Sequence, residues 1–271
     1  MKHFFKVKTL EEVSALDADF HPVETEVIPV SEAYGRILAQ DISASRDLPG
    51  FRRATMDGFA LAAASTFGAS ESAPAWLEIV GTIQMGDTPD FCVEPGKAAG
   101  ISTGGMLPQG ADSVVMVEHT EAVDDFSIEV YKSVAPLQHV IDASEDFAKD
   151  EIILKKGIFI RPQEQGLAAG LGFSELRVFQ RPKIAIISTG DEIIPIEEDP
   201  GPGKIRDINS YALAGFIREA GAEAICYGIV KDDLAALTSV LKKAVEESDM
   251  ILISGGSSVG TRDFTVDAIS A

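Results

Sequence analysis

The segment SGGSSVGTRDF at residues 254–264 combines the residue types of an anion site with a carboxylate beside it. The apolar run at 251–253 suits an inner strand, and the glycines that follow let backbone amides approach a ligand closely. The unpaired amides and positive dipole end of the helix expected next favour phosphate or another oxyanion. The predicted anion-binding residues are Ser254, Gly255, Gly256, Ser257, Ser258 and Gly260, with Asp263 in the first turn of the helix.

This turn matches neither GxxxxGK(S/T) nor GxGxxG, so neither of the two usual nucleotide-binding motifs applies. A tight connection without a ligand therefore remains the alternative for the segment taken alone. The elements expected upstream are a strand at 183–188, a helix at 209–217, a strand at 224–230 and a helix at 234–245. Asn209 and Ser210 are good caps for the first helix, and Gly221 stops it. This alternation predicts a parallel sheet that binds ligands beyond the carboxyl ends of its strands.

Carboxylates follow each of the three predicted strands of this sheet. Asp191 and Glu192 come after the first strand, Asp232 and Asp233 after the second, and Asp263 after the third. Carboxylates that crowd a phosphate repel it unless a cation is present, and Mg²⁺ prefers oxygen ligands of both kinds. We therefore expect Glu192, Asp232 and Asp263 to bind Mg²⁺. The alternative for Asp232 and Asp233 is that they only cap the following helix.

The front of the chain carries a second unusual run, RDLPGFRRATMDGFAL, in which Asp57 stands between bulky apolar residues. This run is followed by the segments GGMLPQGADSVVMVEHTE, ISTGDE, GPGKIRDINSY and SGGSSVGTRDF. Their order and spacing resemble those of the molybdopterin molybdenumtransferase family, MoeA, from about Ser31 to Phe264. The C-terminal part also looks like the domain that this family shares with the MogA and MoaB adenylyltransferases.

The resemblance implies an enzyme of molybdenum cofactor assembly. Members of the family accept molybdopterin-AMP from a MogA-like adenylyltransferase, release AMP and insert molybdate at the dithiolene sulfurs with the help of a divalent cation. They are homodimers, whose site lies between the inserted domain and the α/β domain. Matching motif to motif, the resemblance assigns the catalytic roles to Asp57, Thr103, Asp146, Glu192, Asp232 and Asp263.

Two departures from the family limit this assignment. The family has an arginine-rich run ending in Arg-x-Gly-Glu-Asp before the acid, whereas this chain reads VIDASEDF at 140–147. The chain also stops at Ala271, before the rest of the α/β domain and a small β domain, so we expect a C-terminally truncated member that binds molybdopterin weakly without completing the insertion. The cations that remain as expected neighbours of the anion are Lys204, Arg206, Arg52 and Arg53. The alternative for Lys204 and Arg206 is that they are solvated charges of a loop.

The fold class that follows is multidomain. We expect an elongated α+β dimerisation domain at 1–46 plus 151–180, opened by a capping box between Thr9 and Glu12. A mostly-β domain is inserted at 47–150, and an incomplete α/β domain of the MogA and MoaB type covers 181–271.

Composition agrees with a cytoplasmic protein. The formal charge of −20 over 271 residues argues against nucleic acid as a partner, because counterion release needs clustered lysine and arginine. We expect no signal peptide and no membrane span, and the lone Cys92 and Cys226 lack the spacing of a metal site. Two other functions stay open: a molybdopterin adenylyltransferase, and a scaffold that binds molybdopterin without chemistry. The sequence does not distinguish molybdate from tungstate, since both are tetrahedral dianions.

Overall fold

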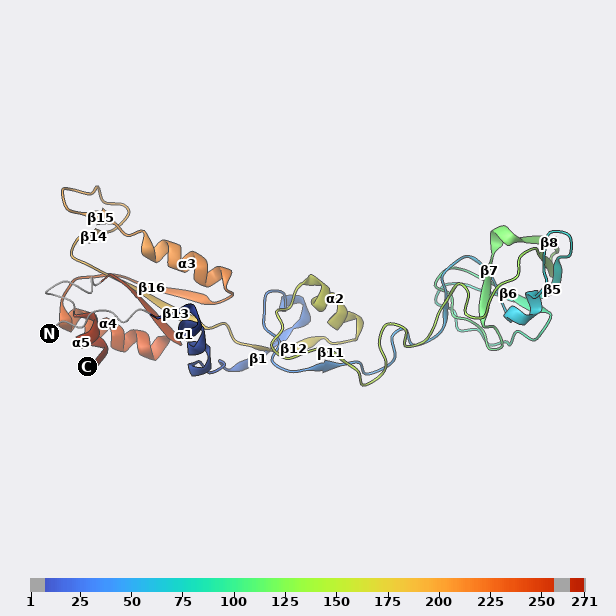
Figure 1. Ribbon diagram of the computed structural model, residues 1–271, viewed down its shortest axis with the longest axis horizontal. Coiled ribbons are helices and arrows are strands. Elements are labelled where there is room, and N and C mark those ends of the chain that lie inside the picture. Colours follow the sequence, from blue (N-terminus) through green and yellow to red (C-terminus); the bar gives the residue numbers. More distant parts are fainter. Residues whose placement is uncertain (1–7, 256–263, 271) are drawn as a thin grey trace. The chain divides into compact units, whose positions relative to one another are not determined.

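The computed structural model describes residues 8–255 and 264–270 (Figure 1). The chain divides into two compact units, one formed by Asp41–Leu154 and the other by Met1–Gln40 with Lys155–Ala271. In the described residues no helix is both long and apolar enough to cross a membrane. Cys92 and Cys226 are exposed free thiols.

The unit Asp41–Leu154 is built on a six-stranded sheet with the order β7-β4-β6-β5-β9-β8. Its strands are β4 (Gly58–Leu61), β5 (Ala75–Ile83), β6 (Lys97–Ile101), β7 (Ser113–Met116), β8 (Thr120–Asp124) and β9 (Ser127–Val130). Alternating side chains divide between two buried clusters, one around Ala60 and Val114 and the other around Leu61 and Val115. The unit is therefore a mostly-β domain, as predicted, and it has a core on each face of one sheet.

Shorter elements complete this unit. They are β2 (Ile42–Ser43) paired with β11 (Ile152–Leu154), β3 (Arg53–Ala54) paired with β10 (Val140–Ile141), and the 3₁₀ helices η3 (Ala63–Thr66) and η4 (Val117–His119). Strand β7 thus leads directly into the 3₁₀ turn η4. The pairing of β3 with β10 brings the RRATMDG run beside the VIDASEDF run.

The other unit begins with α1 (Leu10–Ser14), whose capping box between Thr9 and Glu12 forms as predicted. The elements that follow in this part are η1 (Ala15–Asp19), β1 (Thr25–Pro29), η2 (Val30–Glu32), α2 (Pro162–Gly170) and β12 (Glu175–Phe179). Strands β1 and β12 pair antiparallel although they come from opposite sides of the inserted residues. Several apolar side chains of this part are exposed, among them Leu10, Val13, Leu16 and Phe20.

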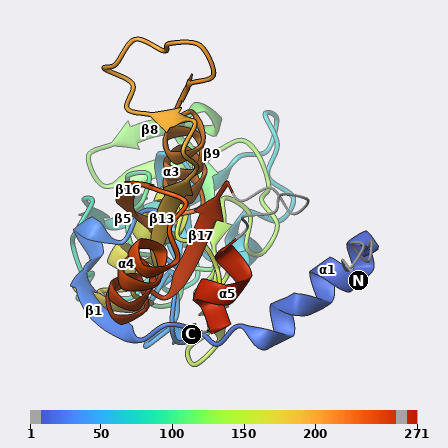
Figure 2. The same cartoon turned by 90° about the vertical axis from the view of Figure 1, so that its left-hand side faces the viewer.

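The α/β part of this unit contains a parallel sheet with the order β16-β13-β17 (Figure 2). Its elements are β13 (Lys183–Thr189), β14 (Ile193–Ile194), β15 (Ile205–Arg206), α3 (Asn209–Glu219), β16 (Glu223–Val230), α4 (Leu234–Glu247), β17 (Met250–Ser254) and α5 (Thr265–Ser270). Helix α3 packs on one face of the sheet, and α4 packs on the other with Ala268 of α5 (Figure 1). The predicted alternation of strands and helices is confirmed.

Two details of this part differ from the sequence prediction. Strand β17, expected inside the sheet, has a strand on only one side within the described residues, and its side chains are half-buried. Asn209 and Ser210 lie inside α3 rather than capping it, because the Asp207 carboxylate accepts a hydrogen bond from the Ser210 amide. Gly221 ends the helix as expected, with a φ of +86° that suits glycine.

Candidate functional site

Asp57 and Thr103, two predicted site residues of the inserted domain, lie in contact. Oδ1 of Asp57 accepts hydrogen bonds from the Thr103 amide at 2.7 Å and from Thr103 Oγ1 at 2.9 Å. Antiparallel pairing sets Gly58 opposite Ile101, so the turn before β4 meets the turn after β6. The Thr103 amide, followed by the hydroxyl, lowers the pKa of Asp57. This exposed carboxylate is therefore held in place and kept ionised.

Gly58, next to Asp57, is required by close packing. A Cβ at this position would lie 1.9 Å from the Val115 carbonyl oxygen. Only glycine lets β4 approach β7 so closely while Asp57 enters the adjacent turn. The glycine of MDGF is thus required by the packing of β4 against β7.

Asp146, the third predicted residue of this domain, is exposed and only its backbone is engaged, by an amide hydrogen bond to Leu48. Within the described residues no hydrogen bond or ion pair joins its carboxylate to Asp57 or Thr103. One base that contacts this segment is Arg52, whose Nε donates to Asp142 at 2.7 Å and lowers the pKa of Asp142. Arg52 is therefore paired with a neighbouring acid.

In the α/β domain, Asp232 is held by a threonine. Oγ1 of Thr189, the last residue of β13, donates to Oδ1 of Asp232 at 2.8 Å. Asp233 accepts from the Ala236 amide at 2.8 Å and is the N-cap of α4. Of the two acids, one is a helix cap and the other is not, which settles the alternative that the sequence left open.

The turn after β13 carries Asp191 and Glu192. The Glu192 carboxylate folds back over Gly190, where a Cβ would meet its oxygens at 2.8 Å. The Asp232 amide donates to Oδ1 of Asp191 over a long 3.4 Å. Carboxylates from the ends of β13 and β16 thus gather at one edge of the sheet, as predicted for parallel strands.

The glycine-serine turn is described only at its beginning. Ser254 accepts a hydrogen bond from the Asn209 side chain. Gly255 has a φ of +116°, and a Cβ there would lie 1.8 Å from the Thr189 carbonyl oxygen. The predicted residues Gly256, Ser257, Ser258, Gly260 and Asp263 lie outside the described residues.

One buried carboxylate, Asp207, was not foreseen. Its Oδ1 accepts from Ser188 Oγ at 3.1 Å and from the Ser210 amide at 3.1 Å, while the Ser188 and Ser210 hydroxyls lie 2.8 Å apart. Burial raises the pKa of Asp207, but hydrogen bonds from Ser210, Ser188 and the Asn209 amide outweigh burial and leave the pKa lowered. The signal available in the sequence was an aspartate three residues before Ser210 at a helix start.

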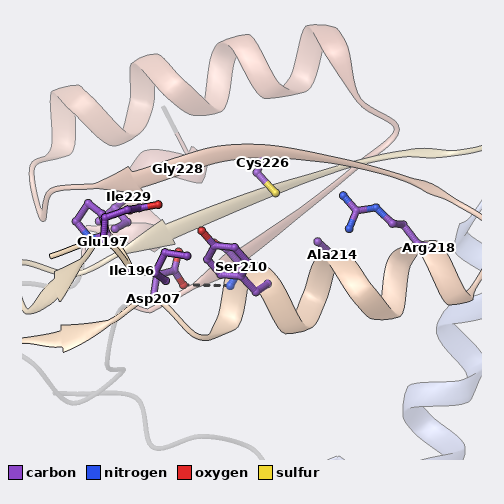
Figure 3. A pocket seen from close by; sticks show the side chains of 11 residues that line it. Ile196, Glu197, Asp207, Ser210, Ala214, Arg218, Cys226, Gly228 and Ile229 are labelled. Atoms are coloured by element: carbon purple, nitrogen blue, oxygen red, sulfur yellow. Dashed lines mark hydrogen bonds between the residues drawn. The ribbon is translucent and has the colours of Figure 1, made fainter. Parts of the chain in front are cut away.

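Asp207 and Ser210 also line a cavity of about 550 Å³ beside α3 (Figure 3). The other lining residues are Pro195, Ile196, Glu197, Tyr211, Ala214, Arg218, Cys226, Gly228 and Ile229. None of the predicted catalytic residues is among them. The predicted site is instead the edge of the sheet where β13, β16 and β17 end.

The two loop cations differ in their partners: Lys204 keeps its positive charge beside Asp191, whereas Arg206 is paired with an acid of its own loop. Lys204 donates to the Asp191 carbonyl oxygen at 2.6 Å, and Arg206 donates to Glu198 and Asp199 of its own loop. Arg206 therefore belongs to the structure of the loop, and Lys204 joins the loop to the turn that carries Asp191 and Glu192.

The oxygen donors of this edge fit Mg²⁺ in kind. Among the described residues no three His, Cys, Asp or Glu side chains form a group that could hold a metal by themselves. Mg²⁺, however, is usually held by one or two carboxylates together with substrate phosphates and water. Asp232 and Glu192 are hard oxygen donors of this type, and Asp191 lies beside Asp232.

Comparison with known families fits both parts of the chain. Residues 7–172 match the MoeA N-terminal region, described as domains I and II. Residues 185–271 match a probable molybdopterin binding domain. The chain belongs to the MoeA family. The multidomain fold class predicted from the sequence is thereby confirmed.

Individual relatives agree with this membership. A putative molybdopterin biosynthesis protein of Methanocaldococcus jannaschii is 43% identical over 250 residues, which are 89% of this chain and 60% of that protein. A molybdopterin molybdenumtransferase of Nostoc is 35% identical, covering 92% of this chain and 56% of the relative. The structure of a MoeA protein from Pyrococcus horikoshii OT3 matches with a TM-score of 0.83 and 37% identity, covering 90% of this chain and 65% of that one. The chain thus spans less than two thirds of these MoeA relatives.

Proposed function

We propose that the chain serves molybdenum cofactor biosynthesis as a molybdopterin molybdenumtransferase, which releases AMP from molybdopterin-AMP and inserts molybdate. One observation carries this proposal: Asp232 lies at the carboxyl end of a parallel strand, is not the helix cap, and accepts a hydrogen bond from Thr189. It lies within the residues that match the molybdopterin binding family. The printed name of the Nostoc relative supports the type of reaction.

The acids of the α/β domain would hold the cation of this reaction. Glu192 and Asp232 are the described candidates, with Asp263 as the third ligand that the sequence predicts. Mg²⁺ bound there would neutralise negative charge on the phosphoanhydride oxygens as AMP leaves. The turn at 254–260 would hold a phosphate of the substrate through its amides.

The inserted domain would contribute an ionised acceptor. Asp57 is exposed, oriented by Thr103 and has a lowered pKa, so near neutral pH it accepts hydrogen bonds. Amide and amino groups of a pterin are donors that suit such a carboxylate. Asp146 would serve the same substrate from the neighbouring segment.

The test is release of AMP by the 271-residue chain from molybdopterin-AMP, with the full-length Nostoc relative as the positive control. Because the truncated chain is expected to bind molybdopterin weakly and not to complete the insertion, we expect Mg²⁺-dependent release far below that of the full-length relative. This release should fall further in Asp232→Asn, in keeping with the loss of an electrostatic group. Glu192→Gln should weaken Mg²⁺ binding without unfolding the domain. Release that is unchanged in Asp232→Asn contradicts the proposed site.

The same assay separates the other two functions. A molybdopterin adenylyltransferase would consume ATP and form molybdopterin-AMP instead of releasing AMP. A scaffold would bind molybdopterin-AMP and release nothing. The adenylyltransferase function is disfavoured because residues 7–172 match the MoeA N-terminal region.

We also propose a cytoplasmic homodimer that receives its substrate from a MogA-like adenylyltransferase. Leu10, Val13, Leu16 and Phe20 are exposed within eleven residues of sequence, and their apolar surface supports self-association. Light scattering at micromolar concentration should give twice the mass of the 28.8 kDa chain. A monomer at that concentration contradicts the dimer.

A further inference from the structure

Resting on the proposed function, we propose that Thr189 is a positioning residue that orients Asp232 for the cation. Thr189 belongs to the ISTGDE segment, in which the proposed function otherwise assigns a role only to the acidic residues. Its hydroxyl donates to Oδ1 of Asp232 at 2.8 Å. The hydrogen bond joins the ends of two neighbouring parallel strands.

The Thr189 hydroxyl is itself held firmly. The residue is only 2% exposed and pairs with Val230 of β16 in the sheet register. On its other side Gly255 packs so closely that a Cβ would lie 1.8 Å from the Thr189 carbonyl oxygen. A β-branched side chain in a strand has restricted χ1, so the direction of the hydroxyl is fixed by the sheet.

Asp232, in contrast, has little else to orient its carboxylate. Asp233 caps α4, so Asp232 is not committed to the helix. Among the described residues, the hydrogen bond from Thr189 is the one that this carboxylate accepts. With Oδ1 occupied, Oδ2 stays available for a cation or a substrate.

The neighbouring hydroxyl, that of Ser188, makes a similar hydrogen bond on the opposite face of the sheet. Ser188 precedes Thr189 and points to the opposite face, as alternate residues of a strand must. It donates to Asp207, which is buried and satisfied by the start of α3. Ser188 therefore provides a matched control with a similar bond to an acid that has a structural role.

The experiment compares Thr189→Val, Thr189→Ser, Ser188→Ala and Asp232→Asn in the full 271-residue chain. Mn²⁺, which prefers the same ligands as Mg²⁺, is titrated in the presence of inorganic phosphate, which stands in for the substrate phosphate. The free fraction of Mn²⁺ is measured by electron paramagnetic resonance. Thermal unfolding of each variant is recorded in parallel. We expect Thr189→Val to weaken Mn²⁺ binding 10- to 100-fold, as is typical of partners that orient a metal ligand. Thr189→Ser keeps the hydroxyl without the β-branch, so it should restore most of the affinity. Ser188→Ala should lower stability without changing the affinity.

The outcomes separate the inference from the proposed function. Loss in Thr189→Val with recovery in Thr189→Ser supports the positioning role, because a packing defect is not repaired by a smaller side chain. Wild-type affinity in Thr189→Val, together with loss in Asp232→Asn, overturns the positioning role and leaves the metal site intact. Equal binding by wild type and Asp232→Asn, or none by either, overturns the proposed metal site and this inference with it.

Discussion

The inserted domain and the α/β domain each hold an aspartate with a threonine from a neighbouring strand. Thr103, just after β6, donates a hydrogen bond to Asp57, just before β4. Thr189, the last residue of β13, donates a hydrogen bond to Asp232, just after β16. Neither aspartate is a helix cap. In each region a glycine lies next to a member of the pair, and a Cβ on that glycine would clash with a backbone carbonyl. The same local arrangement thus occurs between the antiparallel strands β4 and β6 and between the parallel strands β13 and β16.

The difference lies in what holds the carboxylate. Asp57 receives the amide and the hydroxyl of Thr103, so the backbone alone can fix it. Asp232 receives a hydroxyl from Thr189 and no amide among the described residues. Orientation therefore depends on the main chain in the first region and on one side chain in the second. The following predictions test that contrast.

The largest effect is expected from Gly58→Ala. The new Cβ would lie 1.9 Å from the Val115 carbonyl oxygen, inside a sheet with partners on both sides of β4. Separating β4 from β7 should lower the free energy of unfolding by about 3 kcal/mol and release Asp57 from Thr103. Thermal unfolding measures the change, and Gly50→Ala, whose Cβ would meet only the Asp47 carbonyl oxygen at 3.7 Å, is the control.

Gly255→Ala should cost less than Gly58→Ala, although its Cβ clash is as severe. Gly255 follows the last paired residue of β17, so the chain can move away from Thr189 there, as β4 cannot. The φ of +116° adds strain, and the expected loss is about 1–3 kcal/mol. If Gly255→Ala proved more destabilising than Gly58→Ala, strand ends would not be the more tolerant of the two regions.

Asp207→Asn should have a moderate effect on stability and none on metal affinity. The asparagine side chain lacks the negative charge that the Ser188 hydroxyl and the amides at the start of α3 stabilise. The free energy of unfolding should therefore fall by about 1–3 kcal/mol. The folded-state pKa of Asp207 is below its unfolded value, so its stabilising contribution is present above the unfolded pKa, about 3.9. That contribution is lost as pH falls through the folded pKa. Urea unfolding of both proteins between neutral pH and pH 3 should show the difference shrinking with acid; a constant difference would contradict the assignment.

The smallest effect is expected from Thr103→Val. The Thr103 amide, the larger cause of the low Asp57 pKa, remains after the hydroxyl is removed. Carbon-detected NMR titration should therefore find the pKa of Asp57 raised only part of the way to its ordinary value, with Thr103→Ser unchanged. A full return to the ordinary pKa would mean that the side chain, and not the backbone, holds Asp57, which would remove the contrast with Asp232.

Much of the molecule was determined by the sequence alone, because the forces involved are local. The capping box of Thr9 and Glu12, the end of α3 at Gly221 and the alternation of strands and helices follow from hydrogen bonds and periodicity over a few residues. The gathering of acids at one sheet edge follows from the parallel connection of the strands. Motif order was sufficient to identify the family.

The roles of individual acids were decided only by the tertiary structure. Thr103 and Asp57 are 46 residues apart in sequence, and Thr189 and Asp232 are 43 apart, so no local pattern encodes either hydrogen bond. Adjacent Asp232 and Asp233 look alike as helix caps, and the fold assigns the cap to Asp233 because its side chain reaches the Ala236 amide. Asp207 became a buried cap because β13 brings Ser188 against the start of α3. Sequence lists the available donors and acceptors, and packing decides which of them meet.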